Sequence, residues 1–391
     1  MIRTLPSLLK RLAYYGYLDD TTLGDVDSLS GDALTSVLHG IADNLMARRA
    51  APSWPEARYQ TPNEAFQDCI ARFDGVALNA EEQEILAQLS PWGSEAYARL
   101  APTFKKRREN GFTVPALGIV EGDVCGDLAV MAAESLSHDQ LRAANVIADR
   151  YLEETGDYAT LRVLIYFIAY VCLYRALEVV DDPESRLAYL REAGWVAEFR
   201  VPYLLIGTGV HGSGKGDFTY SAMKELGGIR IRASVERARI LGKSVANTPE
   251  DFDDVTTEQT YRRMAHITGL LLEAGYPVYI DASCLARTQR ALLRNEAEAR
   301  GLAVMIVSFE ADQATLEARV AERQRKVGLP VEDGLRILSE QQVRFEPFND
   351  DELFHLVHLD TTQPDANDTL VALIRENVRI PGTTIPVPLL G

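Results

Sequence analysis

The sequence predicts an α/β protein built in two parts. A mostly α-helical domain spans residues 1–198, and residues 199–380 form a parallel β-sheet flanked by helices. In the first part apolar residues recur three and four positions apart, which is the spacing of amphipathic helices. In the second part short apolar runs alternate with helix-length segments, which is typical of a parallel sheet covered on both faces. A chain of 391 residues also exceeds one ordinary core and favours two domains.

The first part contains five expected helices. One begins on Asn79, a residue type that caps helix N-termini well, and it carries acids in its first turn. Another contains the apolar run 163–174, which is bounded by two arginines and is shorter than the roughly 20 residues that cross a bilayer. We therefore expect a buried helix there and no contact with a membrane. The expected helices cover residues 7–18, 32–50, 79–89, 137–157 and 161–178.

The second part alternates strands and helices. Residues 204–226 run from an apolar strand through a glycine-rich turn into a helix. The final residues, 381–391, are broken by proline and glycine and are expected to form an extended tail. Further strands are expected at 277–283, 303–311 and 351–362, and further helices at 257–275, 288–301, 312–328 and 365–377.

Composition narrows the function classes. The chain is 47% hydrophobic and 25% charged, as soluble globular proteins are. Its formal net charge of −17 argues against general nucleic-acid binding, which needs a basic surface. The four cysteines are scattered without a CxxC pair, and no secretory signal is recognisable, so we expect a cytoplasmic protein.

The glycine-rich turn reads GVHGSGKG and matches the phosphate-binding pattern G-x-x-x-x-G-K. In that pattern, backbone N–H groups and the N-terminus of the following helix bind phosphates, and the lysine, here Lys215, reaches the β- and γ-phosphates. The turn therefore predicts ATP binding, and a chance glycine-rich turn is the alternative. The expected contacts with the nucleotide are Gly209, His211, Gly212, Ser213, Gly214, Lys215, Gly216 and Asp217.

The residue after the lysine raises a question about magnesium. A serine or threonine hydroxyl usually binds Mg²⁺ at that position, but this chain has Gly216 followed by Asp217. An aspartate can bind the metal, although its charge repels phosphates when the metal is absent. Thr219 is expected on a different face of the helix. The candidate Mg²⁺ ligands are therefore Asp217 and, further along the chain, Asp281.

The segments around this turn resemble known kinases. "GSGKG" is similar to the loop of adenylate kinases, and the second part resembles the P-loop small-molecule kinases of the zeta-toxin and gluconate-kinase-like group. Nearly the whole chain resembles bacterial fusions of an aminoglycoside-phosphotransferase-like domain with such a kinase. The resemblance implies a P-loop NTPase fold and transfer of a phosphoryl group from ATP to a hydroxyl.

The resemblance also implies roles for single residues. Arg232 would position the phosphoryl acceptor. Two residues further on, the family has an aspartate that is a candidate base, and this chain has Ser234 at that position. Asp281 lies in "IDAS", which fits the family's Val-Asp-Ala-Thr, and the resemblance implies that it would organise Mg²⁺. The alternative is that Asp281 caps the helix that follows. Arg344 matches a family position near the nucleotide, and residues 359–362 resemble the turn beside the adenine.

Two arginines one helical turn apart, Arg319 and Arg323, match the family's lid helix. There they would reach the phosphates and stabilise the transferring charge. The alternative is a solvated arginine face that pairs with Glu317 and Glu322 on the same helix.

The first part resembles only the later helices of an aminoglycoside-phosphotransferase-like domain. The β-rich nucleotide lobe is missing, and residues 113–121 stand where the family has its His-Gly-Asp catalytic loop. Asp123 and Asp127 match a structural helix start, with a catalytic pair as the alternative. The basic cluster 104–110 is interpreted as a solvated helix end, and a site for a phosphate or an acidic partner is the alternative.

Two functions remain open. One is an ATP-dependent kinase that acts on a hydroxyl of a small molecule or nucleotide, with Mg²⁺ as its cofactor. The other is a catalytically degenerate nucleotide-binding scaffold or regulatory protein, which would contact a protein partner through its helical part. The residues expected to carry catalysis are Lys215, Asp281, Arg319, Arg323 and Arg232.

Overall fold

The chain divides into two compact units, Met1–Phe199 and Arg200–Gly391. The computed structural model describes residues 5–14, 17–18, 31–49, 61–112, 123–138, 140–198, 201–246 and 248–378. The predicted tail, 381–391, and the segment that replaces the catalytic loop, 113–121, both lie outside these residues.

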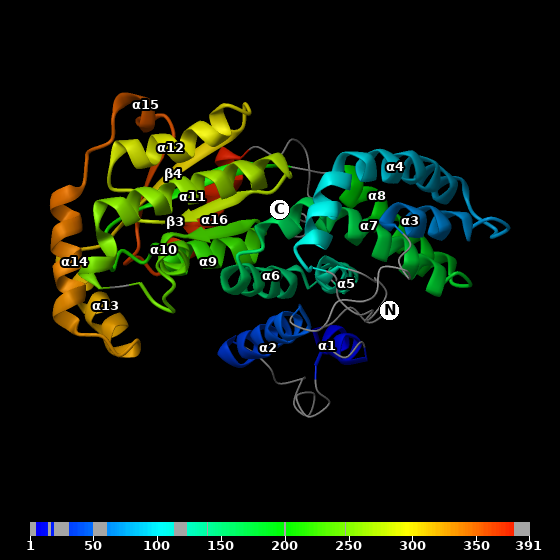
Figure 1. Ribbon diagram of the computed structural model, residues 1–391, viewed down its shortest axis with the longest axis horizontal. Helices are drawn as coiled ribbons and strands as arrows, with labels where there is room; N and C mark the ends of the chain where they lie inside the picture. The colour runs from blue at the N-terminus through cyan, green and yellow to red at the C-terminus, as the bar shows by residue number, and fades with distance from the viewer. Residues whose placement is uncertain are drawn as a thin grey trace. The chain divides into compact units, whose positions relative to one another are not determined.

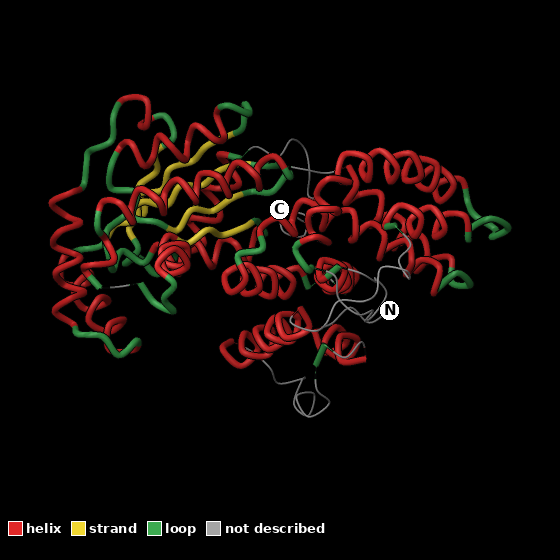
Figure 2. Tube along the Cα trace, in the orientation of Figure 1, coloured by secondary structure: helices red, strands yellow, loops and turns green. Residues whose placement is uncertain are grey.

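The first unit is helical throughout its described part (Figure 2). Asn79 caps α4 as predicted, because its side chain accepts a hydrogen bond from the amide of Glu82 and the Glu82 carboxylate accepts one from the amide of Asn79. The helices are α1 Leu5–Tyr14, α2 Gly31–Arg49, α3 Pro62–Ala71, α4 Ala80–Glu109, α5 Val124–Ser137, α6 Leu141–Thr155, α7 Leu161–Glu178 and α8 Pro183–Glu198.

The apolar helix α7 lies in the core of the first unit, as its sequence predicted. It packs mainly against α8 and α5, and most of its side chains are buried. Within the described residues, Tyr158–Glu178 is the one helical stretch that is long and apolar enough to cross a membrane, and 72% of its apolar window is buried inside the protein. Burial of this kind is typical of a core helix.

The basic cluster 104–110 is not uniformly solvated. Arg107 is buried, and its guanidinium binds Asp123 at 2.9 Å and Asp157 at 2.8 Å. Asp123 also caps α5, and Asp127 accepts a hydrogen bond from the hydroxyl of Tyr17. These contacts support the structural interpretation of both aspartates, because a buried arginine is stable only when its charge is paired.

The second unit is built on a five-stranded sheet of order β2-β3-β1-β4-β5 in which every pair of neighbours is parallel (Figure 1). Helices α9 and α16 pack on one face around a shared apolar core, and α11 and α12 cover the other face. The strands are β1 Tyr203–Thr208, β2 Ile229–Arg232, β3 Val278–Asp281, β4 Ala303–Glu310 and β5 Leu356–Asp360. The helices are α9 Lys215–Leu226, α10 Ala233–Leu241, α11 Asp254–Glu273, α12 Arg287–Glu298, α13 Gln313–Lys326, α14 Val331–Arg344, α15 Asp350–Leu353 and α16 Ala366–Asn377.

The predicted α/β fold is confirmed, but several elements differ from expectation. In the first unit α3 and α8 were not predicted, and α4 continues to Glu109 instead of ending near residue 89. In the second unit the differences include the last strand and one long helix. The last strand covers Leu356–Asp360 only, because Asn349 and Glu352 form a reciprocal cap that starts the short helix α15 where the strand was expected to begin. Helix α14 was not predicted. It buries a narrow stripe of side chains that includes Ile337 and Leu338.

Parallel pairing brings the carboxyl ends of the strands to one edge of the sheet. Gly207 of β1 lies opposite Asp281 of β3, and Asp281 in turn lies opposite Arg232 of β2. The glycine-rich turn follows β1 at this same edge. Residues far apart in the sequence therefore meet there and form the candidate site.

Candidate functional site

The phosphate-binding turn depends on glycines in a backbone conformation that other residues avoid. Gly209, Gly212 and Gly214 have φ values of 151°, 84° and 86°. A Cβ atom on Gly212 would lie 2.6 Å from the carbonyl oxygen of Leu316, which is closer than real contacts allow. The turn can therefore follow this path, tight against α13, only with glycine at that position.

The turn presents unused donors. In the described part of the chain, the backbone N–H groups of Gly212, Gly214, Lys215 and Gly216 donate no hydrogen bond. They lie at the N-terminus of α9, where the helix dipole also favours negative charge. A set of unused amides at a helix N-terminus is suited to an anion such as phosphate.

Lys215 is the first residue of α9, and its ammonium donates to the carbonyl oxygen of Val210 at 3.3 Å. Burial lowers the pKa of Lys215 to about 8, and the nearby carboxylate of Asp281 opposes this effect. The cations Arg323 and Arg237 lower the pKa further. The charged form of a lysine that lies close to other cations is stabilised most when an anion binds between them.

Most of the predicted site residues line one open cavity of about 1700 Å³. Ser213 and Gly209 do not line it. The hydroxyl of Ser213 is buried and lies 2.7 Å from the position of a Cβ on Gly209, so this side chain supports the turn from behind. The predicted residues in the cavity wall are His211, Gly212, Gly214, Lys215, Gly216, Asp217, Arg232, Asp281, Arg319, Arg323 and Arg344.

Asp281 lies at the end of β3, is 9% exposed, and its carboxylate is 3.4 Å from Nε of Arg232. A Cβ on Gly216 would lie 3.3 Å from its Oδ2 atom, so the carboxylate faces the first turn of α9. The capping alternative is wrong, because α12 begins only at Arg287, after Ala286. The carboxylate therefore points into the cavity, not toward a helix end.

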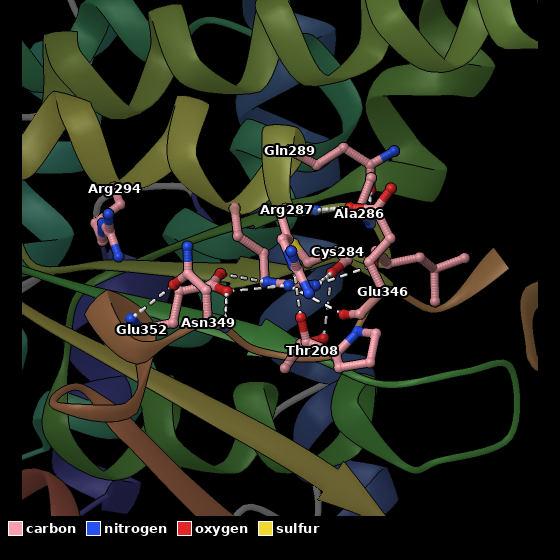
Figure 3. A network of polar contacts seen from close by, with 12 residues as sticks. Thr208, Cys284, Ala286, Arg287, Gln289, Arg294, Glu346, Asn349 and Glu352 are labelled. Carbon is pink, nitrogen blue, oxygen red and sulfur yellow. Dashed lines mark hydrogen bonds and ion pairs between the residues drawn. The ribbon is translucent and has the colours of Figure 1, made fainter.

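The loop after β3 is held by a network that sequence reasoning missed (Figure 3). Cys284 has a φ of 48°, the one described residue other than glycine with a positive φ. Its carbonyl oxygen accepts hydrogen bonds from Arg290 at 3.0 Å and Thr208 at 3.4 Å, and its amide donates to the hydroxyl of Tyr261 at 2.8 Å. This network fixes the backbone that follows Asp281.

The two arginines of α13 differ in their contacts. Arg319 donates to the side chain of Thr361 at 2.8 Å and to its carbonyl oxygen at 3.0 Å, which joins α13 to the turn after β5. The side chain of Arg323 makes no hydrogen bond or ion pair with any residue that the structure describes. The alternative of a self-paired helix face is wrong, because Glu322 pairs with Lys326 and Glu317 accepts from Gln313.

His211 and Arg344 complete the predicted set. His211 is buried, its amide donates to the side-chain oxygen of Gln341 at 2.7 Å, and its Nε2 atom has no hydrogen-bond partner. Burial, with Arg323 and Lys215 nearby, lowers the pKa of His211 to about 3, so the ring is neutral. Arg344 is exposed and lies 3.3 Å from Asp254 at the start of α11.

The residues present fit a Mg²⁺ ion that is shared with a nucleotide. The described residues contain no group of three His, Cys, Asp or Glu side chains that could hold a metal by themselves. Asp281 and Asp217 both line the cavity, and Mg²⁺ is commonly bound by one or two carboxylates together with phosphates and water. Thr219 is unsuitable, because its hydroxyl donates within α9 to the carbonyl oxygen of Lys215 at 2.8 Å.

The parallel sheet and the glycine-rich turn together define a P-loop nucleotide-binding domain. Comparison with known proteins agrees, since a family described as AAA domain (AAA_33) matches residues 204–348. No curated protein matches the chain.

Solved structures are similar to part of the chain. A sugar kinase from Janibacter sp. is 20% identical, with a TM-score of 0.35, over 46% of this chain and 96% of that chain. A gluconokinase from Sinorhizobium meliloti is 20% identical, with a TM-score of 0.33, over 46% and 93%. The APS kinase CysC of Mycobacterium tuberculosis, in complex with AMPPNP and APS, is 17% identical, with a TM-score of 0.34, over 46% and 99%.

Proposed function

We propose that the second unit binds ATP and transfers its γ-phosphoryl group to a hydroxyl of a small molecule or nucleotide. The observation that carries this proposal is a group of hydrogen-bond donors that line one cavity and bind no carboxylate. Four turn amides, the ammonium of Lys215 and the guanidinium of Arg323 meet there without a bound carboxylate of their own. Charge-assisted hydrogen bonds from such a group suit a polyphosphate.

Each residue has a part in this proposal. The turn amides and Lys215 hold the β- and γ-phosphates, and Arg323 stabilises charge on the transferring group. Arg319 joins α13 to the turn after β5 through Thr361, and it donates to the carbonyl oxygen of Gly212 in the phosphate-binding turn at 3.4 Å. Asp281, with Asp217, would hold Mg²⁺, which when bound would neutralise charge on the phosphate oxygens.

The transfer balances without a protein base. The acceptor oxygen forms a bond to the γ-phosphorus while the bond from that phosphorus to the β–γ bridging oxygen breaks, and ADP leaves with the electron pair. The hydroxyl proton passes to the transferred phosphoryl group. Position 234, where the family resemblance places a base, holds serine. Phosphoryl transfer depends chiefly on positioning and charge stabilisation, so this absence does not prevent it.

The second candidate function is a nucleotide-binding scaffold without turnover. One observation favours it. Position 216 lacks the metal-binding hydroxyl, and the hydroxyl of Thr219, three residues further along α9, is hydrogen-bonded within its own helix. In this proposal the protein is cytoplasmic, and its first unit, a remnant of an aminoglycoside-phosphotransferase-like domain, contacts a protein partner.

Calorimetry on the full chain separates these candidates. ATP affinity is measured with and without Mg²⁺ on the native chain, on Lys215→Ala, and on Lys224→Ala, which removes a lysine from the other end of α9. Loss of the lysine contact should weaken binding at least about tenfold in Lys215→Ala and leave Lys224→Ala unchanged. Release of ADP that requires Mg²⁺ supports the kinase. Binding of ATP without release of ADP favours the scaffold, and absence of ATP binding overturns both candidates.

A further inference from the structure

Two neutral polar side chains meet in the wall of the cavity, one from the phosphate-binding turn and one from α14. They are His211, which is 5% exposed, and Gln341, which is 6% exposed. The backbone amide of His211 donates to the side-chain oxygen of Gln341 at 2.7 Å. This hydrogen bond joins the turn to α14 and holds both side chains at the cavity.

The same hydrogen bond fixes the orientation of the Gln341 amide. Its oxygen must face the amide of His211, because a backbone N–H can only donate, so the NH₂ group points elsewhere. The NH₂ group donates to no residue that the structure describes. Because Gln341 lines the cavity, a hydrogen-bond acceptor that enters the cavity can use these donors.

The ring of His211 also has no partner. Its Nε2 atom is enclosed by protein and makes no hydrogen bond, and Nδ1 makes none with a described residue either. A ligand in the cavity can therefore reach the ring only at Nδ1. The ring is neutral, because burial and the nearby Arg323 and Lys215 lower its pKa to about 3, so one nitrogen carries a proton and the other a lone pair.

An anion in the cavity would decide which ring nitrogen carries the proton. In protein interiors an N–H group without an acceptor is rarer than an acceptor without its full set of donors, so the enclosed Nε2 is better suited to the lone pair. A negatively charged oxygen beside Nδ1 favours the proton on Nδ1, since hydrogen bonds to charged groups are the stronger ones. With an anion bound, His211 is therefore expected to present Nδ1–H to the cavity.

The surroundings of His211 indicate which anion this is. Lys215 and Arg323 both lie close enough to lower its pKa, and these are the two cations that the proposed function places on the γ-phosphoryl group. We propose that His211 and Gln341 donate hydrogen bonds to the γ-phosphoryl oxygens, so that the cavity distinguishes a nucleoside triphosphate from a diphosphate. This inference rests on the proposed function, which places the γ-phosphoryl group beside the turn. Transfer of that group removes the ligand of both donors and so favours release of ADP.

Calorimetry on the full chain with Mg²⁺ compares the affinities for AMPPNP and for ADP, and native protein should bind AMPPNP more tightly. Gln341→Glu keeps an acceptor for the amide of His211 but replaces the NH₂ donors with a negative charge. It should lower the ratio of the AMPPNP affinity to the ADP affinity at least about tenfold. Gln342→Glu makes the same change at the next position of α14, on an exposed side chain outside the cavity wall, and should leave the ratio unchanged.

Two variants of His211 test the ring. His211→Leu has no donor and should lower the same ratio at least about tenfold, while the ADP affinity changes less than about threefold. His211→Asn retains an N–H donor near the position of Nδ1 and should keep the preference for AMPPNP. A purely structural role of the ring would instead weaken the binding of both nucleotides equally.

Nitrogen-15 NMR of histidine-labelled protein gives an independent readout of the proton. The ring resonances that are missing from His211→Asn belong to His211. AMPPNP should shift its Nδ1 resonance to that of a hydrogen-bonded N–H, and ADP should not.

The outcomes separate this inference from the proposed function. If AMPPNP binds and the ratio is unchanged in Gln341→Glu or in His211→Leu, the inference is overturned and the proposed function stands. The inference is also overturned if these variants weaken both nucleotides equally, or if Nε2 carries the proton in the AMPPNP complex. If native protein binds neither nucleotide, the inference and the proposed function are both wrong.

Discussion

Arg290→Met should lower the free energy of unfolding of the second unit by about 3–5 kcal/mol. Arg290 is fully buried, and its five N–H groups donate to five acceptors. Two are the carboxylate oxygens of Glu352, at 2.5 and 3.1 Å, and three are the carbonyl oxygens of Cys284, Leu285 and Glu346, at 3.0, 2.9 and 3.1 Å. Removing one partner of a buried ion pair costs about 3–5 kcal/mol, because the other charge remains unpaired.

A double variant separates the ion pair from the carbonyl contacts. Burial would raise the pKa of Glu352, but hydrogen bonds from Arg290 and from the amide of Asn349 hold it below its ordinary value. Arg290→Met/Glu352→Gln removes both charges and retains an acceptor for that amide. The carbonyl oxygen of Cys284 keeps a hydrogen bond from Thr208, and that of Leu285 keeps one from the amide of Glu346, so only the carbonyl oxygen of Glu346 is left without a donor. An unsatisfied buried acceptor costs about 1–3 kcal/mol, so we expect only partial recovery, with a remaining loss in that range.

Urea titration followed by circular dichroism measures these changes. The transition of the second unit is identified as the one that a nucleotide shifts to higher urea. Arg262→Gln is the control, because Arg262 pairs with Glu258 on the exposed surface of α11 and should cost less than about 1 kcal/mol. A loss below about 1 kcal/mol in Arg290→Met, or full recovery in the double variant, would refute the reasoning.

Three further outcomes are expected. First, ATP affinity should be constant below pH 8 and fall above it, because binding needs the charged form of Lys215, whose pKa in the free protein is about 8. Calorimetry should show that ATP binding takes up protons above that pH, and the fall in affinity should disappear in Lys215→Arg. Second, Gly212→Ala should weaken ATP binding at least about tenfold without unfolding the chain, because alanine is strained at the positive φ of this residue and its Cβ would meet a carbonyl oxygen of α13. Gly242→Ala is the control, because Gly242 has a similar φ and nothing lies within 4 Å of a Cβ there. Third, Arg107→Met should lower the free energy of unfolding of the first unit by about 3–5 kcal/mol in urea titration, because it leaves two buried aspartates unpaired. Lys105→Ala is the control and should have little effect, because Lys105 is exposed.

The sequence predicted those parts of the molecule that depend on local pattern. The turn from β1 into α9 was recognisable because glycines and Lys215 must follow one another at fixed spacing to surround a phosphate. Asn79 was recognisable as a cap for the same reason, since its partner Glu82 is three residues away. Helix α14 was missed because it buries only a narrow stripe, and a narrow stripe weakens the periodic signal.

Contacts between distant residues could not be predicted. Arg290 and Glu352 are 62 positions apart, and nothing near either residue indicates the other. The burial of Arg237 was equally hidden, because its side chain is 5% exposed only when the neighbouring segments, among them the ring of Phe252 on which it stacks, are in place.

The cationic lining of the cavity has a kinetic consequence, because it lies within a chain whose formal net charge is −17. At low ionic strength an approaching nucleotide is repelled by the whole molecule before it reaches Lys215 and Arg323. At physiological ionic strength fields decay within about 8 Å, so the distant acids are screened while the nearby cations still act. Association should therefore become faster as salt is first added, the reverse of the usual behaviour of steered anionic ligands.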